Sequence, residues 1–395
     1  MKRIKFPKIL EASAMNRKTL RNFVFILHHY IGLVVGVLLI IVGLTGSLLV
    51  FSPEIDEFLL TRQFGHIIPS GQKIPIEAVI NTVKAAYSNQ PELKVDRIYT
   101  SRKADAAHEV MLEPAQGEAT AVYVNPYTGT IIGSRMSDRT FTTFTLKIHE
   151  QLLAGETGTQ IMGVAALLLF IFSLTSIILW PGWRKLISGF KIKWKNAHPK
   201  RVNFDIHKVA GIIAAVFLTF TGFTGFYLNF RGFVTPIIYA VTFTPNPPDP
   251  VSQPIAGSTA LSLTQLLQKA DPALPNTVTT AVYLPQIPEA AIYIRKKYSH
   301  EEAILGRSGV YLDQYTGKTI QIEDALNKSL GDKVLDSFIL LHFGTFGGLP
   351  TRILYVFVGL APLILFVTGF VMWWYRYRAK TVVSHIIEIS QSGRN

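Results

Sequence analysis

Four histidines form two matched pairs at the ends of apolar segments. His28 and His207 begin the first and third of four apolar runs, and His149 and His342 precede the second and fourth. The first pair is offset by 179 residues and the second by 193. A neutral imidazole is a common transition-metal ligand, and two facing imidazoles can fill both axial positions of one haem iron. The two pairs therefore predict two haems, with these four histidines as axial ligands.

The absence of cysteine narrows the chemistry further. The 395 residues contain none, which excludes iron–sulfur clusters, thiolate ligands and the thioether attachment of c-type haem. Any haem must then be of the non-covalent b type. His29 lies about 100° around a helix from His28 and has no matching partner, so it is a backup ligand only. The remaining histidines are expected at the surface: His66, His108, His198, His300 and His385.

Glycines recur on the same helix faces as the first histidine pair. Gly32 and Gly46 lie four and eighteen residues after His28, and Gly211 and Gly225 have the same spacing in the third run. At about 100° per residue these positions share the face of the histidine, where they would leave room for a flat macrocycle. Close packing of neighbouring helices is the alternative role.

The elements that must position these residues are membrane spans. Each apolar run is close to the length of about 20 residues that crosses the hydrocarbon core of a bilayer as a helix. The runs are residues 30–51, 159–183, 209–230 and 353–375. A cleavable signal peptide is the rival interpretation of the first run, but no small-residue cleavage pattern follows it.

The net charge of the chain is +13, and the basic residues that produce it lie beside these spans. Residues 1–21, 181–208 and 376–395 together hold 19 basic and 3 acidic residues. The positive-inside rule places all three segments in the cytoplasm and the long intervening regions outside. The charge thus fits a multi-pass inner-membrane protein with both termini inside, and no nucleic-acid partner is expected.

This topology predicts a definite division of the chain. The parts are a cytoplasmic N-terminus with the first span (1–51), a first periplasmic domain ending in the helix of His149 (52–150), the second span (151–183), a cytoplasmic loop (184–206), the third span (207–230), a second periplasmic domain (231–345), the fourth span (346–375) and a cytoplasmic tail (376–395).

The two halves are also related as a parallel internal repeat. At the histidine offsets, Thr45 matches Thr224 and Thr175 matches Thr368, and the segment 123–129 (YVNPYTG) matches 311–317 (YLDQYTG). Each unit contains two spans, so both copies enter the membrane in the same direction. The symmetry axis should then run along the membrane normal, with the matched histidines facing each other across it.

Each outside region has an α+β pattern. In the first, residues 74–88 predict an amphipathic helix, and alternating runs predict strands at 95–101, 108–113, 120–125 and 130–135. In the second, a helix at 261–270 precedes strands near 277–284, 290–297, 309–313 and 318–322. Hairpin turns with glycine at positive φ are expected at Gly129 and Gly317. Neither region contains a recognisable catalytic motif.

Several of these segments resemble the PepSY-associated transmembrane helix proteins, often called iron-regulated membrane proteins. The resemblance lies in Leu27-His28-His29-Tyr30-Ile31-Gly32, in Gly43-Leu-Thr-Gly46, and in the VYVNPYTG and VYLDQYTG segments typical of PepSY domains. It covers nearly the whole chain, although the family commonly has arginine where this chain has His29. It implies a link to siderophore-iron uptake, since some members look like di-haem reductases that release iron from ferric siderophores in the periplasm.

The expected function is therefore haem-dependent reduction of a ferric siderophore, with iron-uptake components as further partners. No dinucleotide-binding fingerprint occurs, so the electron donor should be a separate cytoplasmic protein, free reduced flavin or quinol. Two alternatives stay open. The chain could be a di-haem carrier serving another acceptor or oxidising quinol, or a non-redox PepSY binding or regulatory protein with structural histidines.

Overall fold

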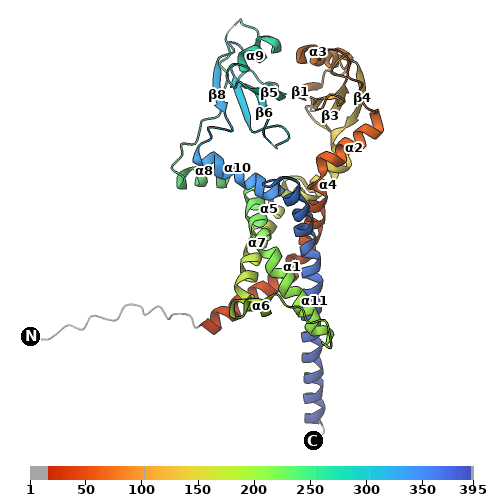
Figure 1. Ribbon diagram of the computed structural model, residues 1–395, viewed down its shortest axis with the longest axis vertical. Coiled ribbons are helices and arrows are strands. Elements are labelled where there is room, and N and C mark those ends of the chain that lie inside the picture. The colour runs from red at the N-terminus through yellow and green to blue at the C-terminus, as the bar shows by residue number, and fades with distance from the viewer. Residues whose placement is uncertain (1–16, 102, 256, 302, 393–395) are drawn as a thin grey trace, which may run out of the picture.

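Four long helices form a bundle below a β-sheet (Figure 1). The computed structural model describes residues 17–392 except 102, 256 and 302, and side chains between residues 18 and 378. The basic residues expected inside at positions 2–8, and Arg394, lie outside this range. The long helices are α1 (Arg17–Leu49), α5 (Gly155–Leu179), α7 (Pro199–Asn229) and α11 (Gly348–Ser392). Each contains an apolar stretch long enough to cross a membrane, as the four apolar runs predict.

Helix α5 packs against α7, and α1 packs against α11. Glycines make these contacts close: a β-carbon on Gly43 would overlap the carbonyl oxygen of Gly359, and one on Gly222 would lie 2.7 Å from the backbone nitrogen of Phe170. The middle of the bundle is filled by an apolar cluster of buried residues, namely Val35, Leu39, Leu169, Ala214, Leu218, Val358, Ala361 and Leu365. Small residues and apolar side chains thus hold the bundle together, as expected where lipid supplies no hydrophobic driving force between helices.

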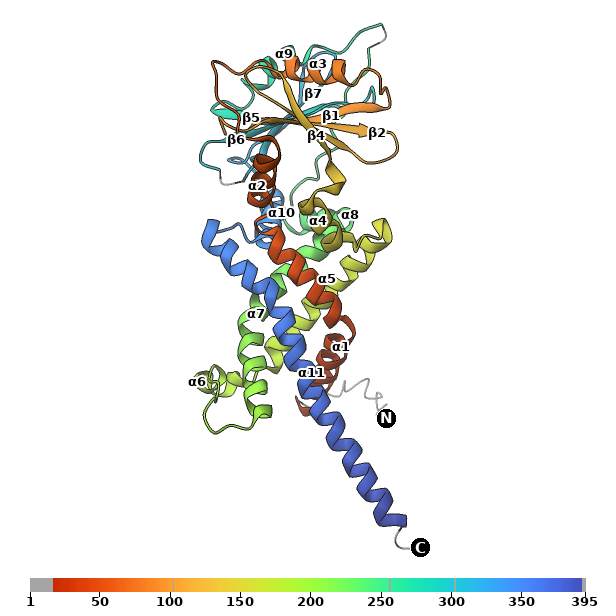
Figure 2. The same cartoon turned by 90° about the vertical axis from the view of Figure 1, so that its right-hand side faces the viewer.

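Shorter helices join the bundle to the sheet (Figure 2). They are α2 (Ser52–Phe64), α4 (Phe141–Gln151), α8 (Arg231–Val241) and α10 (Leu330–Phe343). Helix α4 is followed by Leu152 and Leu153, with φ of 51° and 59°, and α10 is followed by Gly344, with φ of 66°. These left-handed residues turn the chain before α5 and α11 begin. His149 and His342 therefore lie on separate helices, α4 and α10, which precede the spans.

The sheet contains eight strands in the order β4-β3-β2-β1-β5-β6-β7-β8. The first four are β1 (Leu93–Tyr99), β2 (His108–Pro114), β3 (Thr120–Val124) and β4 (Ile131–Met136). The others are β5 (Thr277–Tyr283), β6 (Ile292–Tyr298), β7 (Ser308–Leu312) and β8 (Thr319–Glu323). Helices α3 (Ile76–Ala86) and α9 (Leu263–Ala270) cover the face away from the bundle (Figure 2). These helices and strands confirm the elements predicted from hydrophobic periodicity.

The two regions expected to be periplasmic domains are joined in one sheet. Strand β1 pairs antiparallel with β5, so that Ile98 lies opposite Val282. One core cluster contains buried residues from both regions, among them Val79, Val110, Leu266 and Ile294. The physical reason is that β1 and β5 would each be an open sheet edge, and pairing them satisfies both rows of backbone groups.

The predicted hairpin turns are confirmed. Gly129 has φ of 73° and Gly317 has φ of 67°. Asn125 and Asp313 occupy equivalent turn positions, and their side-chain oxygens accept backbone N–H groups from Tyr127 and Tyr315 at 2.9 and 3.0 Å. Such side-chain acceptors close a turn where glycine then supplies positive φ.

The loop between α5 and α7 is tied to α7 by buried charges. It contains the short helices η2 (Pro181–Arg184) and α6 (Leu186–Gly189). A further short helix, η1 (Ser137–Arg139), lies elsewhere in the chain, before α4. The Lys208 ammonium donates to the Asp205 carboxylate at 2.9 Å and to two loop carbonyls, those of Ser188 and Lys191. Since Asp205 is fully buried, this pair fixes the loop against the start of the span.

Candidate functional site

His149 and His342 face each other where the bundle meets the sheet unit. They are called the outer pair, for the sheet end of the bundle, and His28 and His207 at the other end are called the inner pair. Their ring centroids lie 6.3 Å apart and the ring planes are inclined by 64°. A metal ion bound by two imidazoles lies about 2 Å from each ligating nitrogen. Each nitrogen lies about 1 Å from the centre of its ring, because the ring bonds are about 1.3 Å long. The two ring centres would then be roughly 6 Å apart. The spacing of the two imidazoles therefore suits axial ligation of one metal ion between them.

Both rings have their Nδ1 atoms bonded to the protein. His149 Nδ1 lies 3.1 Å from Thr45 Oγ1 and 3.0 Å from the carbonyl oxygen of Val42. His342 Nδ1 lies 3.1 Å from Thr224 Oγ1. A carbonyl oxygen only accepts hydrogen bonds, so Nδ1 of His149 carries the proton. That leaves Nε2 of His149 with a lone pair that could bind a metal.

Burial keeps the two outer imidazoles neutral. Burial, and to a smaller extent the neighbouring His149, lowers the pKa of His342 to about 3. Burial also lowers the pKa of His149, against a hydrogen bond to the Val42 carbonyl that raises it. The neutral ring is the form that ligates metals, so both imidazoles could do so at physiological pH without losing a proton.

The glycines eighteen residues after the inner histidines contact these outer rings. A β-carbon on Gly46 would lie 3.0 Å from Cε1 of His149, and one on Gly225 would lie 3.3 Å from Cε1 of His342. Both distances are tighter than ordinary contact. These glycines therefore make room for the imidazole rings, a role that spacing alone could not distinguish from room for a macrocycle.

His28 and His207 occupy the other end of the bundle. His28 Nδ1 lies 2.9 Å from Thr175 Oγ1, and His207 Nδ1 lies 2.8 Å from Thr368 Oγ1. The two rings are close enough to interact electrostatically. The donor set of this inner pair, two imidazoles each bonded through Nδ1, is thus the same as that of the outer pair.

The surroundings of the inner pair differ between the two histidines. The Phe172 ring stacks on His28 at 4.2 Å with planes 15° apart. A β-carbon on Gly32 would lie 3.1 Å from the same ring, so Phe172 fills the space beside this glycine. A β-carbon on Gly211 would make only ordinary contacts, with Ser176 Oγ at 3.6 Å and Leu365 at 3.7 Å.

His29 lies in a different environment from His28. Its ring is stacked on Phe25 at 6.1 Å and meets Tyr30 edge-on at 5.6 Å. The Arg376 guanidinium lies over the same Phe25 ring. The surroundings of His29 are therefore aromatic and cationic. His28 instead bonds a threonine, as its matched partner His207 does.

The other histidines are mostly exposed, as expected, but His108 is an exception. His66, His198 and His300 are exposed, and the side chain of His385 lies outside the described residues. His108 is only 2% exposed, and its Nδ1 accepts the backbone N–H of Ser101 at 2.8 Å. The prediction of a surface position was wrong for His108, because alternation on β2 points it to the core face with Val110 and Leu112.

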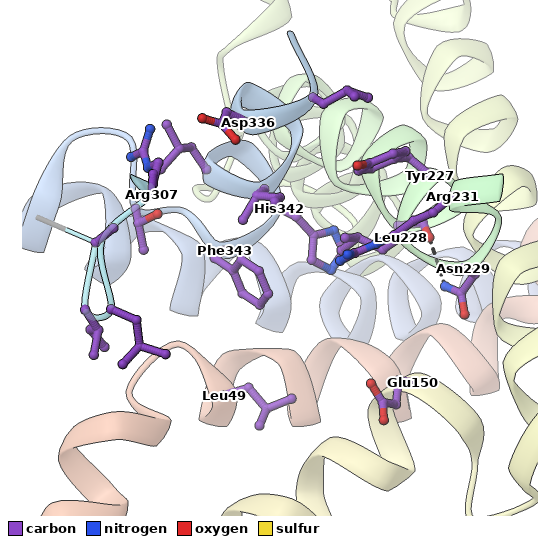
Figure 3. A pocket seen from close by; sticks show the side chains of 18 of the residues that line it. Leu49, Glu150, Tyr227, Leu228, Asn229, Arg231, Arg307, Asp336, His342 and Phe343 are labelled. Atoms are coloured by element: carbon purple, nitrogen blue, oxygen red, sulfur yellow. Dashed lines mark hydrogen bonds between the residues drawn. The ribbon is translucent and has the colours of Figure 1, made fainter. Parts of the chain in front are cut away.

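A large cavity opens between the sheet and the bundle and reaches the outer pair. Its volume is about 2150 Å³, well above the 300–1,000 Å³ of ordinary ligand pockets. Apolar residues such as Leu39, Leu169 and Leu218 line its lower part, and the sheet contributes Tyr293 and Arg295. Figure 3 shows His342 and Phe343 of α10, Arg231 at the start of α8 and Glu150 of α4 around it. His149 and His342 belong to the lining, whereas His28 and His207 do not.

A comparison with protein families covers most of this chain. The model of the PepSY-associated TM region matches residues 25–376. The chain belongs to the PepSY-associated TM region family. A comparison with curated proteins returned no match. The family match spans both outside regions as well as the four membrane helices, so the membership applies to the whole described architecture of this PepSY-associated TM protein.

Sequence reasoning did not assign a role to the four threonines. Their signal was nevertheless present, because Thr45 and Thr224 match at 179 residues and Thr175 and Thr368 match at 193, the same offsets as the histidines. Only the structure shows that each lies within hydrogen-bond distance of a histidine on another helix.

Proposed function

We propose that this PepSY-associated TM protein is an inner-membrane oxidoreductase that holds two b-type haems and reduces ferric siderophores on the periplasmic side. The observation that carries the proposal is the outer pair: His149 and His342 are spaced for one metal ion and line a cavity large enough for a macrocycle and a chelate. Bound haem would supply one-electron chemistry, while the protein supplies position and surroundings.

The proposed topology follows from the basic segments and the duplication. Both termini and the loop between α5 and α7 would lie in the cytoplasm, and the sheet unit would lie in the periplasm. The two halves would be parallel copies, each providing one histidine to each pair. In this topology the cavity would lie on the side where ferric chelates arrive.

The chain's own contribution is to hold two redox sites at opposite ends of the same helices. His28 and Thr45 are 17 residues apart on α1, which corresponds to about 25 Å along the helix axis. Val35, between His28 and Thr45 on α1, belongs to a buried apolar cluster with Ala214 and Leu365, and none of these three lines the cavity. This layer keeps water and ions out of the region between the sites, so charge would cross only through the redox centres.

The reaction balances as one electron from an external donor to one ferric ion. The donor would be a separate cytoplasmic protein, free reduced flavin or quinol, and the product is the ferrous chelate. Siderophores use hard oxygen donors that suit Fe(III), so reduction weakens the complex and releases Fe(II) for uptake. The cavity, lined by charges of both signs including Arg295, Lys328 and Asp336, would receive the chelate.

An absorption spectrum of the purified full-length protein tests the haem sites. A Soret band is expected in the wild type and should be lost when His28, His149, His207 and His342 are all changed to alanine. Stopped-flow mixing of the reduced protein with ferric hydroxamate and catecholate chelates should then show reoxidation with formation of Fe(II). Absence of haem would overturn the whole proposal, and haem without any reaction would favour a carrier serving another acceptor.

The topology can be tested with single cysteines because the chain has none of its own. Lys94→Cys, on an exposed strand position, should react with an impermeant maleimide in intact spheroplasts. Lys195→Cys, in the loop before α7, should react only after the membrane is opened. The reverse labelling pattern would refute the proposed orientation.

A further inference from the structure

The four threonines make the same contact in four places. Within the first half Thr45 of α1 bonds His149 of α4, and within the second half Thr224 of α7 bonds His342 of α10. At the other end of the bundle Thr175 of α5 bonds His28, and Thr368 of α11 bonds His207. The donor–acceptor distances lie between 2.8 and 3.1 Å, and in every case the ring atom is Nδ1.

The direction of these hydrogen bonds follows from the threonines' own helices. Each hydroxyl donates to a backbone carbonyl one turn back: Thr45 to Ile41 at 2.8 Å, Thr175 to Phe172 at 2.6 Å, Thr224 to Phe220 at 2.7 Å and Thr368 to Ile364 at 2.7 Å. A hydroxyl has a single proton, so one that is committed to a carbonyl can only accept from the imidazole. Each histidine must then carry its proton on Nδ1, and each Nε2 presents a lone pair.

We propose that Thr45, Thr175, Thr224 and Thr368 are positioning residues that fix the tautomer and the ring rotation of the four histidines so that Nε2 faces the metal. The inference rests on the proposed function, because it presumes that the histidines ligate haem iron. Metal-ligating histidines generally donate their second N–H to such a partner, which orients the ring and raises its basicity.

Helix packing alone does not account for the arrangement. Thr219 of α7 also donates to a carbonyl one turn back, that of Ala215 at 2.7 Å. Thr219 lies on the same helix as Thr224 and makes the same kind of bond within the helix, but it does not bond a histidine. The variant Thr219→Val is thus a matched control for loss of a hydroxyl within a span.

The inference predicts a change in redox potential. An N–H donated to oxygen increases electron density on the ring, which favours Fe(III) over Fe(II). Replacing threonine by valine keeps the shape and removes the acceptor. A tenfold loss of the preference for Fe(III) would raise the midpoint potential by about 59 mV for a one-electron couple. Haem affinity at the altered site should fall by about 10–100-fold.

The test is a redox titration of the purified full-length protein carrying paired substitutions. Thr45→Val with Thr224→Val should raise the potential and weaken retention of one haem, and Thr175→Val with Thr368→Val should do so for the other. Thr→Ser at the same positions should restore wild-type values, because serine keeps the hydroxyl. Thr219→Val should leave both potentials unchanged.

Two outcomes separate the inference from the function on which it rests. A wild type without haem removes the proposed function. Haem that is lost in the histidine variants but keeps its potentials and affinity in both threonine pairs overturns the positioning role. Ring ¹⁵N spectra of the haem-free wild type provide a second measurement that needs no variant: Nδ1–H tautomers are expected at the four histidines, and Nε2–H tautomers there would refute the inference.

Discussion

At the scale of single residues, the orientation of the histidines and their pairing have different origins. Each histidine is oriented from within its own half, as His149 is by Thr45 and His342 is by Thr224. Each pair, in contrast, is completed across the two halves, since the two outer rings come from α4 and α10. One half could thus prepare its ligands without the other but could not form a bis-histidine site alone.

The choice between His28 and His29 as the inner ligand leads to a prediction. His28→Ala should remove one of two haems, because His28 bonds a threonine in the same way as its match His207. His29→Ala should retain both, because its ring packs on Phe25. Haem-to-protein ratios from pyridine haemochromogen assays measure this, and equal losses in the two variants would contradict the assignment.

At the scale of elements, α1 and α7 have the same design. Each carries an inner histidine near one end and, 17 and 18 residues later, a threonine and a glycine that contact an outer histidine: Thr45 and Gly46 on α1, Thr224 and Gly225 on α7. One rigid helix thus sets the level of both sites. The separation between the sites depends only on helix rise and is insensitive to the loops.

The anchor of the α5–α7 loop should be sensitive to loss of charge. Asp205→Asn leaves the Lys208 ammonium, whose side chain is 5% exposed, without its ionic partner. Removing one member of a buried pair costs about 3–5 kcal/mol. Thermal unfolding in detergent should show a clear drop in the midpoint. Arg201→Gln is the control, since the arginine side chain is 52% exposed and its ion pair with Asp205 is worth about 1 kcal/mol or less.

The turn at Asp313 should contribute a pH-dependent stability to the sheet. Burial alone would raise the pKa of Asp313, but hydrogen bonds from the backbone of Gln253, Thr316 and Tyr315 outweigh it and hold this pKa below 3.8. A depressed folded-state pKa means that the contribution is present above pH 3.8 and is lost as the pH falls through the lower folded value.

Asp313→Asn tests this turn with a residue that the other half already uses, Asn125. The amide oxygen can keep the turn bonds, but its NH₂ group cannot accept the Gln253 N–H that Asp313 Oδ2 accepts at 2.7 Å. Leaving this donor unsatisfied costs about 1–3 kcal/mol near neutral pH. Chemical denaturation at pH 7 and at pH 3 should show the difference from wild type narrowing in acid. An equal difference at both values would contradict the pKa argument.

At the scale of the whole molecule, the sheet joins the two halves above the bundle. Its symmetric strand order places β1 and β5 at the centre and β4 and β8 at the edges. The strand face turned away from α3 and α9 carries a row of tyrosine ring contacts, Tyr99 to Tyr283 to Tyr293 to Tyr311, of which the first and third line the cavity. The sheet thus lines one side of the cavity, and the outer histidines lie on the opposite side, at the bundle.

A substitution at the sheet junction should weaken both outside regions together. Ile98 is fully buried opposite Val282, and its change to alanine should cost about 2–5 kcal/mol. Hydrogen exchange should increase in β1–β4 and β5–β8 alike, because they share one core. Val278→Ala, at a 64% exposed position of β5, is the control and should change stability by about 0.5 kcal/mol or less. Loss of protection confined to the first four strands would show two independent domains.

The sequence by itself determined the elements and the pairing of the histidines. Spans, strands and turns follow from local periodicity and from residues such as Gly129 and Gly317, and the offset of His28 from His207 is visible without coordinates. The tertiary structure alone decided that β1 joins β5 and that Gly46 makes room for the ring of His149. It also decided that Thr45 accepts a bond from that ring. These contacts depend on the rotation and depth of helices far apart in the chain, which local patterns do not encode.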